Sequence, residues 1–315
     1  MNKIGDKYSI IAQNLNDKVW CVYDYNLSLV KFIFRSNNMN KDSLGDRMKT
    51  YENVTRTYLT RRTPVVIRID GKAFHSFTKG FKKPFDDVLV ETMQQTMKYL
   101  CENIEGCVLG YTQSDEITLI LCDYKKLTSQ AWFNNNIQKI CSISASMATL
   151  AFNRFFNENA KAYANRIPYY GTIYPCDERE RIYIDTLKKS VSKGALFDSR
   201  VFNIPQDEVN NCLVWRQQDA IRNSIQSVAQ ANFSHTELMG INCKTLVEKM
   251  QEKGLNWNFL NTHLQRGSCC IKEGVFYLTT KGNTTVYRQK WVIDTHIPIF
   301  SDDPDYVNQR ITFKE

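Results

Sequence analysis

The segment that most constrains the fold is residues 65–71, Val-Val-Ile-Arg-Ile-Asp-Gly, which follows Pro64. A short run of β-branched residues predicts a strand buried in a core. Asp70 stands where this strand would leave the core, and Gly71 would let the backbone turn and come close to a ligand. The chain is therefore expected to deliver a carboxylate to one edge of a sheet.

A second pair of carboxylates, Asp115 and Glu116, stands at the joint between two strand-like runs within residues 107–122. Each acid alone is as well explained by a turn, because turns favour Asp. Three acids that meet from separate strand ends repel one another unless cations lie among them. Their combination predicts two Mg²⁺ ions held by Asp70, the Gly71 carbonyl oxygen and Asp115, and hence phosphate chemistry.

The pattern of apolar residues predicts an α+β fold. A helix is expected within residues 43–60, a strand at 65–69, a helix from Asp86 or Asp87 to about Gly106, a hairpin at 107–122, and a long helix from about Ser129 to Phe156. This order opens a split β-α-β, ferredoxin-like unit, as in a polymerase palm. We therefore expect an antiparallel sheet covered by helices.

The second half of the sequence predicts further helices and a hairpin. We expect a strand near 200–204, a helix at 207–231, two shorter helices within 235–262, a hairpin at 268–293 and an extended arm from Ile297. The predicted parts are a variable N-terminal extension at 1–42, a palm-like catalytic domain at 43–205 and a C-terminal helical and hairpin part at 206–315.

Composition narrows the class of protein only slightly. A net charge of +8 with a pI near 8.9 gives a mild preference for polyanions. None of the ten cysteines has C-x-x-C spacing, which argues against a zinc ribbon and for free thiols in a reducing compartment. No apolar run reaches the roughly 18 residues that span a membrane. We expect a cytoplasmic protein; residues 1–38, Lys-rich but interrupted by acids, keep mitochondrial import as the alternative.

Several basic residues near these acids are candidates for contact with a triphosphate. His75 follows Asp70 by five residues, on the turn that would cover a bound nucleotide. Lys72, Lys83 and Lys139 would neutralise phosphates, although a lysine is usually only a solvated surface charge. A Walker-type glycine-rich loop is absent around these residues, which argues against a P-loop NTPase.

Eight short sequence motifs follow one another in a fixed order over about residues 43–300. They are Arg-Ile-Asp-Gly-Lys-Ala-Phe-His-Ser-Phe at 68–77, Lys-Pro-Phe-Asp at 83–86, Tyr-Thr-Gln-Ser-Asp-Glu at 111–116, Trp-Phe at 132–133, Lys139, Phe-Asp-Ser-Arg at 197–200, Trp-Arg-Gln-Gln-Asp at 215–219 and Arg-Gly at 266–267. Together they resemble the signature of the tRNA-His guanylyltransferase family.

The resemblance implies a nucleotidyltransferase that extends tRNA in the 3′-to-5′ direction. ATP would first adenylylate a tRNA 5′-monophosphate, and the 3′-hydroxyl of GTP or another nucleoside triphosphate would then attack that end. Asp70, Asp115 and Glu116 would be catalytic, with two Mg²⁺ ions on Asp70, Gly71 and Asp115. The implied nucleotide-binding residues are Asp70, Gly71, Lys72, Ala73, Phe74, His75, Lys83, Asp86, Ser114, Asp115, Lys139 and Arg266.

One departure from the family pattern bears on the substrate. Enzymes that act on tRNA-His carry a His-Ile-Asn-Asn-Leu-Tyr-Asn run where this chain has Ile-Arg-Asn-Ser-Ile-Gln-Ser at 221–227. We therefore expect template-dependent addition of nucleotides to 5′-truncated tRNA. The alternatives are addition of the extra 5′ guanylate to tRNA-His, a non-catalytic palm-fold module that binds RNA, and a cyclase of mononucleotides.

The expected macromolecular partner is tRNA, without a role for DNA or a membrane. Contact would be mostly electrostatic, through Lys and Arg on phosphates. The candidates are Arg200, Arg216, Arg222 and Lys290, and residues 206–315 would serve tRNA contact and oligomerisation. The resemblance also implies a homotetramer.

Overall fold

The computed structural model describes residues 8–12, 19–24, 30–34, 43–166, 177–278 and 285–313. The chain forms two compact units, Met1–Arg56 and Thr57–Glu315. Within the described residues, no helix combines the length and apolar character needed to cross a membrane. The proposed site lies entirely within the second unit.

The first unit contains an antiparallel sheet of β1 (Tyr8–Ala12), β2 (Val19–Asp24) and β3 (Val30–Phe34), in that order. Its helix α1 (Ser43–Asn53) buries none of its residues. The strands were not predicted from the sequence, and α1 ends earlier than the helix expected within 43–60. The boundaries proposed for the three sequence parts stay a prediction.

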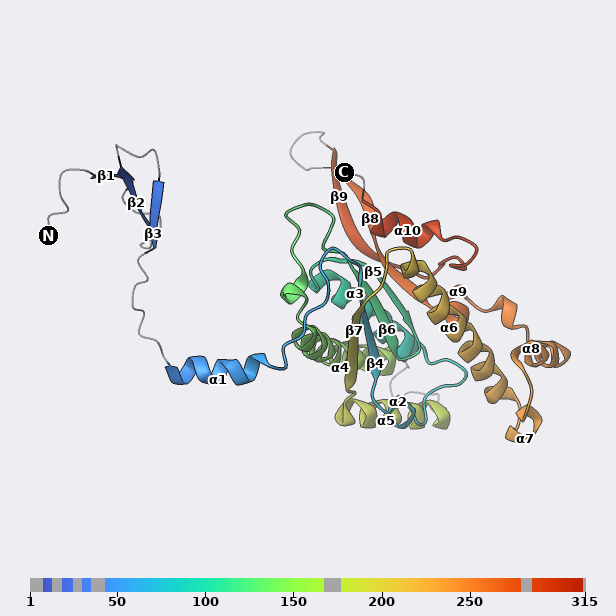
Figure 1. Ribbon diagram of the computed structural model, residues 1–315. Helices are drawn as coiled ribbons and strands as arrows, with labels where there is room; N and C mark the ends of the chain where they lie inside the picture. Colours follow the sequence, from blue (N-terminus) through green and yellow to red (C-terminus); the bar gives the residue numbers. More distant parts are fainter. Residues whose placement is uncertain are drawn as a thin grey trace. The chain divides into compact units, whose positions relative to one another are not determined.

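The second unit is built on a six-stranded antiparallel sheet (Figure 1). Its strand order is β7-β4-β6-β5-β8-β9. The first four strands have the order of a split β-α-β sheet, which confirms the predicted fold class. The strands are β4 (Val65–Gly71), β5 (Cys107–Gln113), β6 (Glu116–Leu121), β7 (Phe197–Asn203), β8 (Ser268–Leu278) and β9 (Thr285–Asp294).

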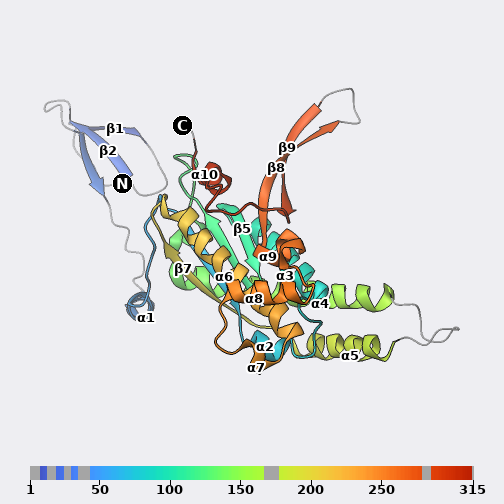
Figure 2. The same cartoon turned by 90° about the vertical axis from the view of Figure 1, so that its right-hand side faces the viewer.

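Helices cover both faces of this sheet, because the start of β4 is apolar on both sides and one of its faces stays apolar to Ile69. Ile67 and Ile69 pack in the core beneath α3 (Asp87–Asn103) and α4 (Ile137–Arg166). Val66 points the other way, into a second core with α6 (Glu208–Asn232). The helix α5 (Glu178–Lys193) runs beside α4 (Figure 2). Two-sided burial fixes the strand's register, so the side chains near its end have set directions.

The predicted start of the long helix near Ser129 is wrong. A short 3₁₀ turn, Trp132–Asn135, precedes α4, and Phe133, Asn134 and Asn135 have positive φ angles. A right-handed helix cannot continue through such residues. The helix itself packs on the sheet through Ile140 and small residues, since Ile140, Ser144, Ala148 and Ala151 are fully buried.

The expectation of an extended arm from Ile297 is also wrong. Ile297 and Phe300 are fully buried in the core beneath α6, and the chain then forms α10 (Asp305–Ile311). Gln217 of α6 holds this segment, since its side chain accepts a hydrogen bond from Phe300 N and donates one to Pro298 O. The tail is therefore part of the fold that supports the sheet.

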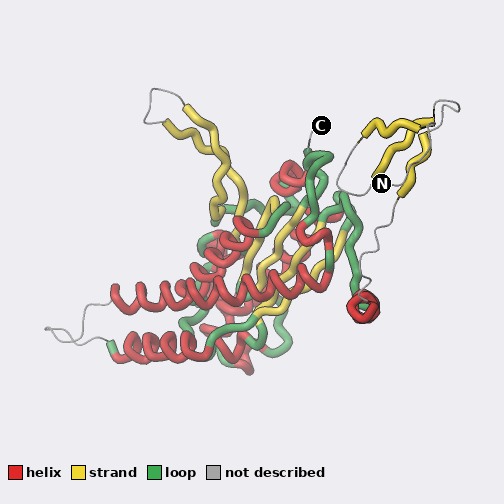
Figure 3. Tube along the Cα trace, turned by 90° about the vertical axis from the view of Figure 1, so that its left-hand side faces the viewer, coloured by secondary structure: helices red, strands yellow, loops and turns green. Residues whose placement is uncertain are grey.

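The two shorter helices predicted within 235–262 correspond to α7 (His235–Leu238) and α8 (Cys243–Glu252). A third short helix, α9 (Thr262–Arg266), was not predicted, and all three pack along α6. The predicted hairpin is formed by β8 and β9, which extend as a long two-stranded ribbon from the sheet (Figures 2 and 3).

Candidate nucleotidyltransferase site

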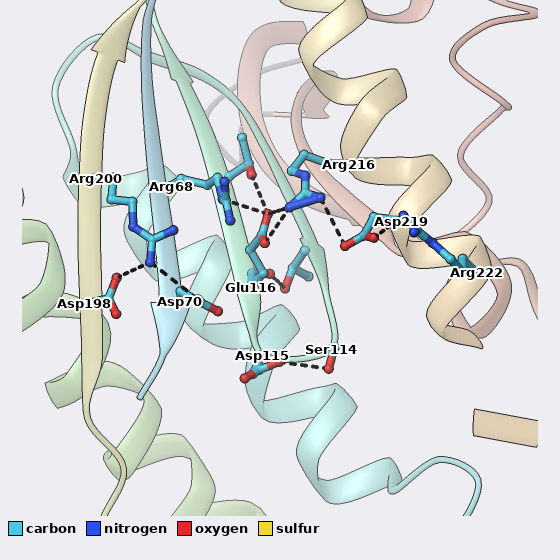
Figure 4. Close-up of polar contacts among 12 residues, drawn as sticks. Arg68, Asp70, Ser114, Asp115, Glu116, Asp198, Arg200, Arg216, Asp219 and Arg222 are labelled. Carbon is cyan, nitrogen blue, oxygen red and sulfur yellow. Dashed lines mark hydrogen bonds and ion pairs between the residues drawn. The ribbon is translucent and has the colours of Figure 1, made fainter. Parts of the chain in front are cut away.

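Acidic residues from three adjacent strands meet at one end of the sheet (Figure 4). Asp70 of β4 lies opposite Glu116 of β6 and opposite Asp198 of β7 in the strand register. The turn that carries Ser114 and Asp115 joins β5 to β6. Gly71 N donates a hydrogen bond to Asp115 O over 3.1 Å, so the turn is fixed beside the end of β4. The structure thus brings together the acids predicted to form one cluster.

Two of these carboxylates, Asp70 and Asp115, are poorly neutralised. Asp115 makes no ion pair with a described residue and accepts a hydrogen bond from Ser114 Oγ over 2.9 Å. Burial raises the pKa of Asp115, the Ser114 bond lowers it, and the negative charge of Asp70 raises it further. Among the described residues, Asp70 forms an ion pair with Arg200 alone, whose Nη2 lies 3.9 Å from Oδ2. Neighbouring acids with this little compensation would gain stability from a bound cation.

The donor set of these two acids fits Mg²⁺. Two carboxylates and the backbone carbonyl of Gly71 supply oxygen ligands only, which suits a hard cation that keeps waters and takes substrate phosphates. Among the described residues, no group of three or more His, Cys, Asp or Glu side chains forms a complete metal site by itself. An ion here would therefore depend on water and substrate for the rest of its ligands.

Glu116 takes a different role from Asp70 and Asp115 in this structure. Its carboxylate accepts hydrogen bonds from Arg216 Nη1 over 3.0 and 3.3 Å, and Arg68 Nε lies 3.4 Å away. Burial raises the pKa of Glu116, while Arg216 and then Arg68 lower it. Arg216 also contacts Asp219 at 3.1 Å. Glu116 is therefore the centre of an arginine network beside the site, and its oxygens are already occupied.

A cleft of about 280 Å³ adjoins Asp115 between α3, α6, α9 and the β5–β6 turn. Its buried lining includes the apolar Phe74, Phe81 and Met93, which we call the floor, and its exposed lining includes His75 and Lys83, which we call the rim. A pocket with an apolar floor and a few convergent polar groups suits a nucleobase with its phosphates at the rim. The lining includes His75, Lys83, Phe85, Leu89, Met93 and Gln94.

The predicted nucleotide-binding segment 71–75 turns sharply at the end of β4. Gly71 is required there, because an added Cβ would lie 2.2 Å from Phe74 Cδ2. Ala73 adopts a left-handed conformation with φ 54°. Phe74 is buried against Phe152 and other rings, while Lys72, Ala73 and His75 are exposed. Phe74 thus anchors a loop whose polar parts face solvent.

Asp86 caps α3 with a fully engaged carboxylate. It accepts hydrogen bonds from Leu89 N, from Lys82 N and from the Tyr183 hydroxyl, over 3.0, 3.1 and 2.7 Å. The side chain is buried. Asp86 therefore shapes the cleft that it lines, by fixing the start of α3.

Neither Lys139 nor Arg266 lines the cleft or the hollow around Asp70. Lys139 is exposed in the first turn of α4, which begins beside Thr57, at the opposite end of β4 from the acids. Arg266 donates through Nε to Ile297 O over 3.1 Å and through Nη1 to Gln265. Their nucleotide contacts stay predictions.

The four candidates for tRNA contact have different surroundings. Arg216 is only 7% exposed and is held by Glu116 and Asp219. Arg222 is exposed but pairs with Asp219 at 2.6 Å. Arg200 is exposed between Asp70 and Asp198, and Lys290 is exposed on β9. Contact of all four with tRNA stays a prediction.

Sequence reasoning missed several residues that line the site. Gln113 and Asn223 face both the cleft and the hollow around Asp70 and Glu116. Ser227 and His263 line the cleft as well. Asn223 and Ser227 are four residues apart on α6, so helical periodicity could have placed them on one face. His263 had no such signal, because α9 is too short to show a period.

The fold and the acids at its edge define a palm-like enzyme of the nucleotidyltransferase class. Comparison with known proteins gives the particular family. The family model for tRNAHis guanylyltransferase matches residues 45–205, and the chain belongs to this family. This identifies an enzyme and argues against the alternative of a non-catalytic module.

Sequence relatives agree with this assignment. The tRNA(His) guanylyltransferase of Schizosaccharomyces pombe is 25% identical over 274 residues, which cover 81% of this chain and 92% of that protein. The uncharacterized protein R259 of Acanthamoeba polyphaga mimivirus is 29% identical over 225 residues, which cover 68% and 72%.

Solved structures extend the comparison to three dimensions. A bacterial tRNA(His) guanylyltransferase-like protein in complex with ATP has 44% sequence identity and a TM-score of 0.69, over 86% of this chain and 100% of that chain. Its complex with GTP gives 43% identity and a TM-score of 0.66. The tRNA(His) guanylyltransferase of Saccharomyces cerevisiae, at 20% identity and a TM-score of 0.51, shares the fold.

Proposed function

We propose that this protein adds nucleotides to the 5′ end of truncated tRNA in the 3′-to-5′ direction, with the 3′ strand as template. The observation that carries the proposal is the 44% identity to a guanylyltransferase-like protein solved with ATP, over that protein's full length. The run at 221–227, which differs from that of enzymes acting on tRNA-His, supports it. Its Asn223 and Ser227 line the cleft beside Asp115.

In the proposed reaction, two displacements at phosphorus follow one another. An oxygen of the tRNA 5′-monophosphate attacks the α-phosphorus of ATP, and pyrophosphate leaves. The 3′-hydroxyl of the incoming triphosphate then attacks the 5′ phosphorus of the adenylylated tRNA, loses its proton and displaces AMP. Such transfers depend on positioning and on neutralised charge more than on a protein nucleophile.

The residues of this chain would supply these two requirements. Mg²⁺ held by Asp70, Asp115 and the Gly71 carbonyl would neutralise phosphate charge and orient the reacting oxygens. His75 and Lys83, at the rim of the cleft, would contact phosphates of ATP or GTP, and the apolar floor would hold the base. The buried Arg216, held by Glu116 and Asp219, would fix the position of Glu116 beside the other acids.

The second candidate function is addition of the extra 5′ guanylate to tRNA-His. The names of the family and of the S. pombe relative favour it. Purified protein should be given each labelled nucleoside triphosphate with 5′-truncated tRNA, carrying matched or mismatched 3′ partners, and with intact tRNA-His. Repair predicts incorporation that follows the opposing base. Guanylate added to tRNA-His alone, whatever the opposing base, would refute the repair proposal.

The assembly and compartment belong to the same proposal. A homotetramer and a cytoplasmic site, with mitochondria as the alternative, follow from the family resemblance and the sequence pattern. The described cysteines outside the first unit are all free, in agreement with a reducing compartment. Light scattering would give the oligomeric state, and imaging of the tagged protein would give the compartment.

A further inference from the structure

A second cleft, of about 290 Å³, lies at the opposite end of β5 from Asp115. It is formed by Cys107 at the start of β5, by β8 and β9, by the loop after β6 and by α10. Lys125, Lys272 and Arg310 line it from three separate elements, and we call it the basic cleft. Among the described residues that line it, none is acidic.

Among the described residues, the three cations of the basic cleft contact aromatic rings and no carboxylates. None of its three cations forms an ion pair with a described carboxylate. Each lies over an aromatic ring instead, which holds the cation and leaves its charge intact. The distances to the ring centroids are 5.7 Å from Lys125 Nζ to Phe313, 4.8 Å from Lys272 Nζ to Trp291 and 4.2 Å from Arg310 Cζ to Tyr306.

Acids close to these cations have another direction or other partners. Glu273 follows Lys272 directly on β8, so its side chain points to the opposite face of the strand. Asp123 accepts a hydrogen bond from Arg62 N over 2.8 Å and contacts Arg61. Asp294 accepts one from the Tyr306 hydroxyl over 2.7 Å. A concave surface with three free cations and two glutamine side chains, Gln289 and Gln309, is suited to bind phosphate groups.

We propose that the basic cleft binds the phosphate backbone of the tRNA while its 5′ end lies at Asp70 and Asp115. This inference rests on the proposed function, which supplies the RNA. Along β5, the six steps from Cys107 to Gln113 at about 3.3 Å each separate the two sites by about 20 Å. A duplex stem of several base pairs spans that distance, whereas a free nucleotide does not. The cleft would therefore hold the RNA and leave the chemical step to the acids.

The test is a triple variant with Lys125→Gln, Lys272→Gln and Arg310→Gln. Its affinity for 5′-truncated tRNA is measured over a range of salt concentrations. We expect at least a tenfold loss of affinity, and a decrease of about 2 to 3 in the slope of log K against log salt, at roughly 0.7–0.9 per lost phosphate contact. The matched control replaces three exposed lysines on α4, α5 and α8, Lys161, Lys189 and Lys244, with glutamine.

A short RNA hairpin separates binding from chemistry. Its stem should be too short to span about 20 Å, so the triple variant should transfer nucleotides to it at the wild-type rate. Equal affinity and slope in the triple variant and the control would overturn the inference. Failure of the proposed function would look different, because the wild-type protein would then transfer nothing to either RNA. If the triple variant does not fold, the double variant Lys125→Gln, Lys272→Gln, which keeps Arg310, replaces it. A salt slope of tRNA binding equal to that of the wild type would then overturn the inference.

Discussion

Replacement of Glu116 with glutamine would leave the guanidinium of Arg216 without its main carboxylate. Arg216 is 7% exposed and Glu116 21% exposed, so water compensates little for the lost contact. Breaking a fully buried pair costs about 3–5 kcal/mol, whereas exposed pairs contribute about 1 kcal/mol or less. Asp219 still contacts Arg216 at 3.1 Å in the variant. We therefore expect a coupling free energy between Glu116 and Arg216 of about 2 kcal/mol, between the values for exposed and for fully buried pairs.

A double-mutant cycle measures this coupling directly. Glu116→Gln, Arg216→Gln and the double variant are unfolded with urea, and the change in the free energy of unfolding is compared. Glu116→Gln alone should lower Tm by roughly 4–8 °C. The control cycle uses Arg181 and Glu178, which lie 2.7 Å apart but are more than half exposed, so their coupling should stay below about 1 kcal/mol.

Activity assays decide what the pair does. If Glu116 acts by holding Arg216, Glu116→Gln should lower the transfer rate by up to about 100-fold and leave the Mg²⁺ concentration for half-maximal rate unchanged. A coupling no larger than that of the exposed control pair would refute the structural reasoning. A large increase in the Mg²⁺ requirement would instead make Glu116 a metal ligand.

Three further predictions concern the acids and the walls of the site. Asp70→Ala or Asp115→Ala should reduce the rate of nucleotide transfer by about 1000-fold, because neutralisation of phosphate charge by a metal ion is worth several kcal/mol. The affinity for tRNA should be retained, and persistent activity would contradict the metal assignment. Asp86→Ala should lower the free energy of unfolding by about 3 kcal/mol, because α3 loses its N-terminal cap and the buried hydroxyl of Tyr183 loses its acceptor. Replacement of the neighbouring, exposed Asp87 with alanine is the control. Gly71→Ala should cost about 1–3 kcal/mol in a thermal unfolding experiment, because the methyl group overlaps an aromatic ring; an unchanged Tm would count against that packing.

The arrangement of the sheet could be predicted because its signals are local. Alternating and β-branched runs mark the strands, and their order with the helices permits few topologies. The side-chain pairings could not be predicted in this way. Glu116 meets Arg216 from a distant helix, and nothing in either neighbourhood specifies that contact. Ile297 and Phe300 lie in a short apolar run, Ile-Pro-Ile-Phe, which has no helix or strand period, and only the core beneath α6 explains their burial.

The pairing of Asp70 with Asp198 in adjacent strands has a consequence for how the protein is made. β4 has a neighbour on each side in the sheet, yet both partners, β6 and β7, follow later in the chain. Non-local pairing of this kind is slow, because a long loop must close before the contacts form. On the ribosome, β4 would emerge with both edges open and would remain unpaired until the later strands are synthesised. Asp198 would thus join Asp70 only late, when most of the second unit's central strands are already available.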